Sequence, residues 1–299
     1  MEPSEPRAFE ITMEQKDLIT TGWADYELLD SGNCRKLERF GSVITDRPDT
    51  QAIWSPARDE VWSTATAKFT QEGKDNKWEF KEEVPEKWVL NFHGLIFGLR
   101  FGNFKHLGVF PEHAVQWNWL EEKVKALGTA NVLNLFGYTG AASLAARVAG
   151  AEVTHVDSSK QSVEWASENA KLSDIEEGIR WIVDDAATFV KREVKRGAKY
   201  EGIVLDPPAF GRGAKGQVWH IEEDLLPLLR DLKEILSPKP GSFLLLSGYA
   251  AGFAPRSFAQ AVESVFGQNV EITFGNLDLQ ESNSDRVIPT GIYVRLILT

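Results

Sequence analysis

The 299-residue chain has a single cysteine, no long apolar run and few features of an exported protein. Cys34 alone can form no internal disulfide and cannot supply a cysteine-rich metal site. No apolar stretch approaches the ~20 residues that span a bilayer. The N-terminus is polar and acidic, unlike a secretory signal. These absences predict a cytoplasmic protein with no membrane segment and no required metal.

Positive charge is also scarce, because the formal net charge is −11. Proteins that bind nucleic acid through a broad electrostatic surface are usually basic. An RNA substrate would therefore have to be recognised through local basic patches. One candidate patch, which is either a solvated helix face or a track for RNA phosphates, comprises Lys191, Arg192, Lys195, Arg196 and Lys199.

The chain divides into three parts. Residues 1–22 are expected to be a flexible lead-in. Residues 23–104 combine short β runs, turn clusters and many aromatics, which is typical of a small antiparallel β domain. We interpret its tryptophans as core and inter-domain packing rather than as base-stacking residues. From 105 to 299, strand runs alternate with helical patterns, which predicts an α/β domain with a mostly parallel sheet and a C-terminal antiparallel hairpin.

The stretch 131–159 has the pattern of a nucleotide-binding βαβ unit. Its turn, Gly137-Tyr138-Thr139-Gly140, follows an apolar run that ends at Phe136, and glycine there would let a ligand lie against bare backbone. Asp157 ends the next apolar run roughly 20 residues after the first glycine, a spacing that suits a ribose diol. The third glycine of GxGxxG is missing, so the turn favours an adenosine ligand without phosphates. An ordinary α/β turn with a chance acid is the alternative.

Acidic residues also follow the next two strands of the α/β pattern. Asp185-Ala186 comes after the run 179–183, and Asp206-Pro207-Pro208 comes after the run 202–205. Ligands bind at the carboxyl ends of strands in open α/β sheets, so these residues are expected to lie together. Asp185 could accept from an adenine amino group. The two prolines stiffen the loop in which Asp206 and the Pro207 carbonyl could hold a polar group.

Residues that could contact a substrate follow the prolines. Phe210 is a candidate for stacking on a planar substrate. Arg212 and Lys215 belong to a glycine-rich basic loop suited to phosphates or to closing over a substrate.

This ordered set of motifs resembles the class I S-adenosylmethionine-dependent methyltransferases. Within them, residues 100–299 are similar to the bacterial 23S ribosomal RNA methyltransferases of the large-subunit I/K type. The resemblance includes 108–113, which is similar to a family segment that lies over the cofactor. It implies a Rossmann-like fold with a seven-stranded, mostly parallel sheet, and S-adenosyl-L-methionine as cofactor.

Roles carried over by this resemblance are as follows. The methionine end of the cofactor would be lined by Phe136, Gly137, Tyr138, Thr139 and Gly140. Asp157 would bind the ribose, and Ser158 would lie beside the adenine. Further cofactor contacts would come from Phe110, Pro111, Glu112, Asp185, Ala186 and Asp206. Catalysis would rest on Asp206, Pro207 and Pro208, and substrate binding on Phe210, Arg212 and Lys215.

Two departures from the family pattern limit the reaction. The place of the Ser-Cys-Ser motif of 5-methylcytosine enzymes reads Leu246-Ser247-Gly248-Tyr249, so a thiolate nucleophile is missing. Ala209 separates the prolines from Phe210, unlike the DPPY motif, so transfer to an exocyclic amine stays open.

The sequence therefore predicts an S-adenosylmethionine-dependent methyltransferase that acts on a base of RNA, with ribosomal RNA as substrate. No metal is expected, and a homodimer is possible. Transfer to a small molecule or a protein is the alternative. A nicotinamide-dependent dehydrogenase is disfavoured by the incomplete glycine pattern, and a cofactor-binding module without catalysis also remains open.

Overall fold

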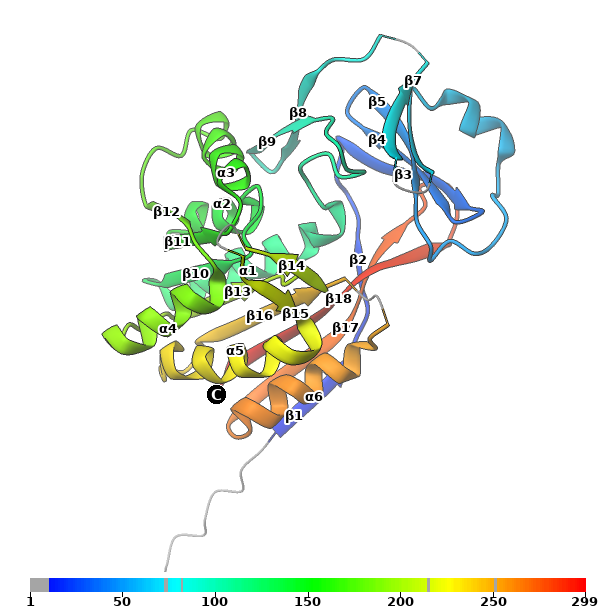
Figure 1. Cartoon of the computed structure of the whole chain (residues 1–299). Helices are drawn as coiled ribbons and strands as arrows, with labels where there is room; N and C mark the ends of the chain where they lie inside the picture. The colour runs from blue at the N-terminus through cyan, green and yellow to red at the C-terminus, as the bar shows by residue number, and fades with distance from the viewer. Residues whose placement is uncertain (1–10, 73–74, 82, 214–215, 250–251) are drawn as a thin grey trace, which may run out of the picture.

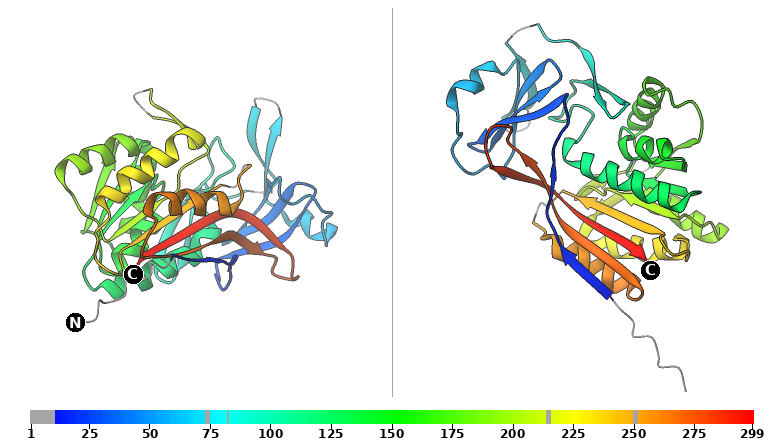
Figure 2. Two further views of the ribbon diagram at one scale, coloured as in Figure 1. Left: turned by 90° about the horizontal axis from the view of Figure 1, so that it is seen from below. Right: turned by 180° about the vertical axis from the view of Figure 1, so that it is seen from behind.

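A computed structural model describes residues 11–72, 75–81, 83–213, 216–249 and 252–299. A large α/β body and a smaller β body lie next to each other (Figure 1). Segments from both ends of the chain, β2 and the β17–β18 hairpin, run between them (Figure 2).

The central sheet of the α/β body has nine strands, in the order β1-β17-β18-β16-β13-β10-β11-β12 with β2 also on β17. Its strands are β1 (Ile11–Gln15), β2 (Leu18–Thr20), β10 (Asn131–Leu135), β11 (Glu152–Asp157), β12 (Ile179–Val183), β13 (Gly202–Leu205), β16 (Phe243–Gly248), β17 (Val270–Gln280) and β18 (Val287–Leu298). Strands β10 to β13 and β16 are parallel, whereas β18 runs antiparallel to β16 and β17. The mostly parallel sheet with an antiparallel C-terminal hairpin is thus confirmed.

The lead-in prediction is wrong for residues 11–20, because β1 and β2 pair in parallel with β17 and enlarge the predicted seven strands to nine. These strands cover what would otherwise be an open sheet edge. The approach is close at Gly275, where a Cβ would lie 2.1 Å from the Lys16 carbonyl oxygen. Residues 1–10 lie outside the described part of the chain.

Helices cover both faces of the sheet (Figures 1 and 2). On one face lie α1 (Ala114–Leu127), α2 (Ala141–Val148) and α3 (Lys160–Leu172), and on the other α4 (Ala186–Arg196), α5 (Ile221–Ile235) and α6 (Pro255–Phe266). The starts of α3 and α4 are fixed by side-chain caps, since Ser159 accepts from the Ser162 N–H and Asp185 from the Thr188 N–H. Apolar stripes of all these helices pack on the sheet and build the core.

The smaller body is β-rich, as predicted. Five strands form one sheet: β3 (Tyr26–Gly32), β4 (Arg35–Phe40), β5 (Val43–Pro48), β6 (Ala67–Glu72) and β7 (Asp75–Phe80). All neighbouring pairs are antiparallel except β5 with β6. Outside these two sheets, the chain forms two hairpins and two 3₁₀ helices. The hairpins are β8 (Lys87–Phe92) with β9 (Leu95–Arg100) and β14 (Phe210–Arg212) with β15 (Val218–His220), and the 3₁₀ helices are η1 (Asp59–Thr64) and η2 (Pro111–His113).

Tryptophans pack where the two bodies meet. Trp23 lies edge-on to Phe92, at 5.1 Å between ring centroids, and to Trp117 of α1, at 5.8 Å. Trp23 and Trp117 are both buried. For these residues the packing interpretation is confirmed. The domain bounds 23–104 and 105–299 stay a prediction.

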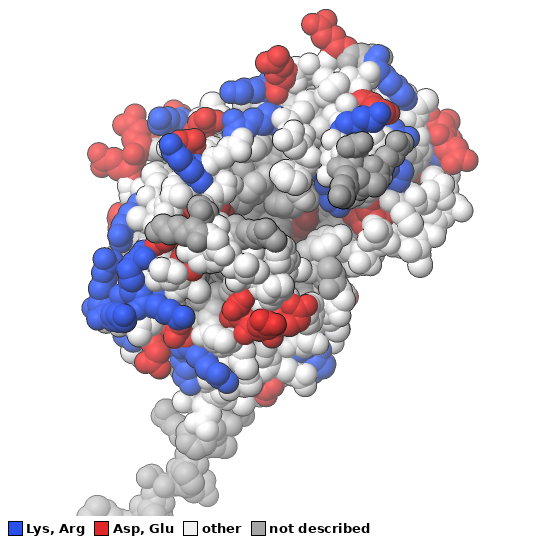
Figure 3. Space-filling view, viewed as in Figure 1, with Lys and Arg blue, Asp and Glu red and all other residues white. Residues whose placement is uncertain are grey.

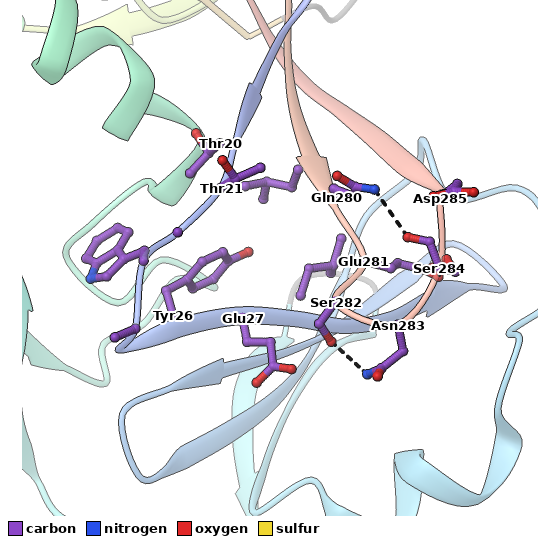
Figure 4. Close-up of a pocket in the computed structure, with 15 residues that line it drawn as sticks. Thr20, Thr21, Tyr26, Glu27, Gln280, Glu281, Ser282, Asn283, Ser284 and Asp285 are labelled. Carbon is purple, nitrogen blue, oxygen red and sulfur yellow. Dashed lines mark hydrogen bonds between the residues drawn. The ribbon is translucent and has the colours of Figure 1, made fainter.

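A buried ion network also ties the bodies together. The Arg286 guanidinium at the end of the β17–β18 hairpin lies 2.6 Å from an Asp30 carboxylate oxygen and 2.9 Å from one of Glu281. Both carboxylate side chains are buried, and Ser31 donates a 2.5 Å hydrogen bond to Glu281. Beside this network lies a pocket of about 770 Å³ between 20–28 and 279–285 (Figure 4). Among the described residues that line this pocket, none belongs to the predicted site.

Candidate functional site

The carboxyl ends of β10, β11, β12 and β13 are bordered by two adjoining pockets, and Phe136 lines both of them. The first pocket is lined by Val109, Phe110, His113, Gln116, Trp117, Asn134, Phe136, Gly137, Tyr138, Thr139, Gly140, Ala141, Ala142, Val204, Asp206, Leu245 and Ser247. The second is lined by Phe136, Asp157, Ser158, Asp184, Asp185, Ala186, Pro208, Gly211, Gly213 and Trp219. Most of the predicted site residues are therefore brought together.

The glycine turn has an unusual backbone. Phe136 and Tyr138 adopt positive φ angles of 54° and 47°, which bulky residues rarely do. The Asp157 carboxylate holds the turn, because it accepts from the Tyr138 N–H at 2.9 Å and from the Ser159 N–H at 2.8 Å. Strained conformations of this kind persist where the surroundings fix them and often mark functional sites.

Packing within the protein explains the two glycines of the turn. A Cβ on Gly137 would lie 2.4 Å from the His155 ring, and one on Gly140 would lie 2.9 Å from the Ala166 Cβ. His155 is fully buried, and burial lowers its pKa to about 3, so the ring is neutral. The turn thus needs glycine to pack on β11 and α3, before any ligand is considered.

Asp157 combines a structural bond with capacity for a ligand. Burial raises the pKa of this carboxyl, although its two backbone hydrogen bonds lower it. Each oxygen uses one acceptor direction for a backbone N–H and keeps another. Since Asp157 and Ser158 both line the second pocket, the carboxylate can also accept from a diol there.

Asp185 lies next along the same pocket. It is the N-cap of α4, since its Oδ1 accepts from the Thr188 N–H at 2.8 Å. This capping bond alone would explain an aspartate here. It occupies one oxygen, so the carboxylate can still accept an amino group from the pocket.

Asp206 and His113 face each other across the first pocket. Asp206 Oδ2 lies 3.7 Å from His113 Nε2. The side chain of Asp206 is 40% exposed and lines this pocket. Desolvation by the surrounding protein raises the pKa of Asp206, and the nearby His113 partly offsets that shift.

The loop after Asp206 is rigidly held. The Trp219 indole donates to the Pro208 carbonyl at 2.7 Å, and the Ile221 N–H donates to the Ala209 carbonyl at 3.1 Å. Trp219 also packs on Phe136, with 5.1 Å between ring centroids. These contacts fix the loop against the glycine turn.

Some predicted residues do not line either pocket. Pro111 and Glu112 are buried in η2, and the Glu112 carbonyl accepts from Thr20 instead. Phe210 is 51% exposed on β14, where its ring packs edge-on to His220 at 5.1 Å. The Arg212 side chain and the whole of Lys215 lie outside the described residues.

Comparison with known proteins decides the family. A family model for S-adenosylmethionine-dependent methyltransferases matches residues 68–258. The crystal structure of the SAM-dependent methyltransferase from Agrobacterium tumefaciens is 40% identical to this chain, with a TM-score of 0.91 and 96% of both chains covered. The chain belongs to the S-adenosylmethionine-dependent methyltransferase family.

Other relatives agree with this assignment. The ribosomal RNA large subunit methyltransferase K/L of Pseudoalteromonas atlantica is 32% identical over 211 residues, which are 70% of this chain and 28% of the relative. The enzyme of that name from Shewanella frigidimarina is 29% identical over 207 residues, covering 68% and 27%. The chain thus matches only about a quarter of the length of these curated relatives. A solved methyltransferase complexed with SAH shares the fold, with a TM-score of 0.73 at 21% identity over 93% of this chain and 76% of that one.

Gln116 of α1 is a methyltransferase-pocket residue that sequence reasoning missed. It is 1% exposed, and its Oε1 accepts from Arg295 Nε at 2.8 Å. This bond orients the amide, and the Nε2 donor is buried without a partner among the described residues. Gln116 is one of the residues that line the first pocket. A polar residue on the helical stripe shared with Leu120 and Val124 is the sequence signal that could have found it.

The two pockets fit S-adenosylmethionine, the cofactor of this family. An unpaired amide donor in the first pocket suits the carboxylate of its methionine part. Asp157 and Asp185 in the second pocket suit its ribose hydroxyls and adenine amino group. The segment 108–113 is fastened to the glycine turn, since Thr139 donates to the Gly108 carbonyl at 2.5 Å and Phe110 packs on Tyr138.

In the described part of this methyltransferase, none of the helices is both long and apolar enough to span a bilayer. Within the same residues, no group of three or more His, Cys, Asp or Glu side chains is placed to hold a metal ion.

Cations gather over α4 on the methyltransferase surface, while acids gather over the start of α5 (Figure 3). Three members of the predicted patch are engaged, because Arg192 pairs with Asp184, Arg196 with Glu193, and Lys199 donates to the Glu234 carbonyl. That leaves Lys191 and Lys195, which lie one helical turn apart, as its candidate phosphate contacts.

Proposed function

We propose that this methyltransferase modifies a base of large-subunit ribosomal RNA. The observation that carries the proposal is the 32% identity over 70% of this chain to a relative named for that substrate. The α4 patch supports it, because a chain of net charge −11 needs local cations to bind RNA.

The pocket geometry supports methyl transfer with little acid–base chemistry. When bound, S-adenosylmethionine supplies an electrophilic methyl group on a sulfonium. Asp206 lies where it can accept a hydrogen bond or a proton from the acceptor, and its raised pKa brings it closer to neutral pH. The rigid loop fixes Asp206 against the glycine turn, so most of the rate enhancement comes from alignment.

The end of β16 argues against a cysteine nucleophile. Gly248 lies in the stretch that takes the place of the Ser-Cys-Ser motif, and a Cβ there would lie 2.9 Å from the Phe258 ring. Cys34 is exposed in the turn between β3 and β4, far along the chain from the pocket. We therefore infer that the acceptor is not the C5 atom of cytosine reached through a thiolate adduct.

The test is methyl transfer from labelled S-adenosylmethionine to large-subunit ribosomal RNA. RNA from a strain lacking the gene should accept label, whereas RNA from the parent strain should not, and mass mapping of the labelled RNA identifies the nucleotide. Equal maps from the two strains would refute the proposal. Label that enters protein or a small molecule instead would support the alternative acceptor that the acidic charge favours.

Charge reversal tests the α4 patch separately. Lys191→Glu with Lys195→Glu should weaken RNA binding and leave S-adenosylmethionine binding unchanged; unchanged RNA binding would remove the patch from the proposal. The cytoplasmic location and the homodimer stay predictions, and light scattering in solution tests the second.

A further inference from the structure

Tyr249 follows β16 directly, and Lys105 lies against its ring. Leu205 of β13 pairs with Leu246 of β16, and Tyr249 follows Leu246 by three residues, as Pro208 follows Leu205. Tyr249 thus leaves the sheet at the same carboxyl-end edge as the loop that holds Asp206. Ser247, two residues before Tyr249, lines the pocket together with Asp206.

Tyr249 is exposed, unlike the strand that precedes it. Every residue of β16 is buried, whereas the Tyr249 side chain is 47% exposed. Burial raises the pKa of the phenol, which therefore stays neutral. A neutral aromatic ring that is about half exposed is suited to stacking.

Lys105 lies against this ring. Its Nζ is 6.0 Å from the Tyr249 ring centroid and donates to the Pro48 carbonyl at 3.1 Å. Burial and the neighbouring cations Lys36 and Arg47 lower the pKa of Lys105. These three ammonium and guanidinium groups lie close together at the junction of the two bodies.

The cations of this cluster differ in their partners. Lys36 lies 3.4 Å from a Glu38 oxygen and 3.5 Å from one of Asp49, and Arg47 lies 2.5 Å from Glu38. Within the described residues, no carboxylate forms an ion pair with Lys105. Asp49 and Glu38 act on the Lys105 ammonium from beyond ion-pair distance and raise its pKa, but burial and the neighbouring cations outweigh them, so an anionic ligand would stabilise the ammonium.

The chain connects Lys105 directly to the methyl-transfer pocket. His106 follows it and packs on Phe110, with 4.9 Å between ring centroids. Phe110 lines the pocket beside Asp206. Burial lowers the His106 pKa to about 3, so this intervening ring is neutral and adds no competing charge.

We propose that Tyr249 and Lys105 form the acceptor-nucleotide site, with the base stacked on the Tyr249 ring and a phosphate bound by Lys105. A nucleotide offers a planar face and an anion on one unit, and these two side chains match that pair. The inference rests on the proposed RNA substrate and assigns the residues that present it to Asp206.

The experiment uses the full chain and large-subunit ribosomal RNA from the gene-deleted strain. Tyr249→Leu should lower kcat/KM about 5- to 150-fold, the range of one lost base stack, while Tyr249→Phe should stay within about twofold of the parent. Lys105→Gln should reduce the slope of log KM against log salt by about 0.7, as one phosphate contact is lost. Lys160→Gln on α3, whose side chain is 79% exposed, is the charge-matched control and should leave the slope unchanged.

Calorimetry with S-adenosylmethionine and thermal melts accompany each variant. Unchanged cofactor affinity with the losses above supports the site. Full activity of Tyr249→Leu, or an equal salt-slope change in Lys160→Gln, would overturn it while leaving the RNA substrate in place. If a loss of cofactor binding accompanies the activity loss in Tyr249→Leu, the residue is structural and the site is also overturned. If the parent enzyme labels no RNA at all, the proposed function has failed and this inference falls with it.

Discussion

Gln116→Glu isolates the contact that the pocket offers to the methionine carboxylate of the cofactor. Arg295 donates to Gln116 Oε1 at 2.8 Å, and a glutamate would keep that bond as an ion pair. The substitution also replaces the buried, unpartnered Nε2 donor of this pocket residue with a carboxylate oxygen. The fold is thus preserved at the point where the ligand contact is lost.

The expected loss follows from one charge-assisted hydrogen bond. Such bonds contribute about 1.5–3 kcal/mol, which corresponds to a roughly 10- to 150-fold weaker Kd. Repulsion between two carboxylates adds to this figure, so about tenfold is the lower bound.

Calorimetry with two ligands makes the measurement specific. S-adenosylmethionine should bind Gln116→Glu at least about tenfold more weakly than it binds the parent protein. Methylthioadenosine lacks the carboxylate and should bind both proteins alike. Equal weakening for both ligands, or binding of S-adenosylmethionine within twofold of the parent, would refute the contact.

Three further predictions address catalysis, the ion network between the two bodies and the glycine turn. Asp206→Asn should slow transfer without abolishing it, because the alignment of donor and acceptor is kept. It should also raise stability at neutral pH, because a raised folded-state pKa means that the carboxylate form opposes folding; urea melts should show the gain vanish at acid pH, where the carboxyl is protonated in both states. Arg286→Ala leaves the two buried carboxylates of Asp30 and Glu281 without their cation and should lower the free energy of unfolding by about 3–5 kcal/mol, as measured by denaturant unfolding. As a control, Arg39→Ala breaks an ion pair whose side chains are both 29% exposed and should cost under about 1 kcal/mol. Equal stability losses for the two variants would contradict the stabilising role of the Arg286 network. Gly137→Ala puts a Cβ 2.4 Å from a histidine ring and should abolish cofactor binding by calorimetry, whereas Gly102→Ala meets nothing within 4 Å and should bind normally.

The α/β architecture could be predicted because its signals are local. The sequences of α1 and α3, for example, show apolar periodicity with a glycine or a serine cap at one end. The attachment of β1 and β2 to β17 could not be predicted. It depends on backbone pairing between residues more than 250 positions apart, which leaves no periodic signal in a short, exposed strand such as β1.

The site was predictable to the extent that its residues follow strands. Asp157, Asp185 and Asp206 were expected at one edge of the sheet, and the structure places them around adjoining pockets. Gln116 and His113 reach the same pockets from α1 and η2, which precede the βαβ pattern, so the strand-end rule does not cover them.

The glycines that define the sequence motif are not the residues that indicate which ligand binds. Gly137 and Gly140 are accounted for by packing against His155 and Ala166, so a fold without any ligand would also need them. Packing does not account for the unpaired amide of Gln116, nor for a carboxyl at Asp206 whose pKa burial raises. Groups of this kind cost stability unless a ligand compensates them, and both face the first pocket. The glycine turn therefore shapes the cavity, whereas the uncompensated polar groups around it indicate what the cavity binds.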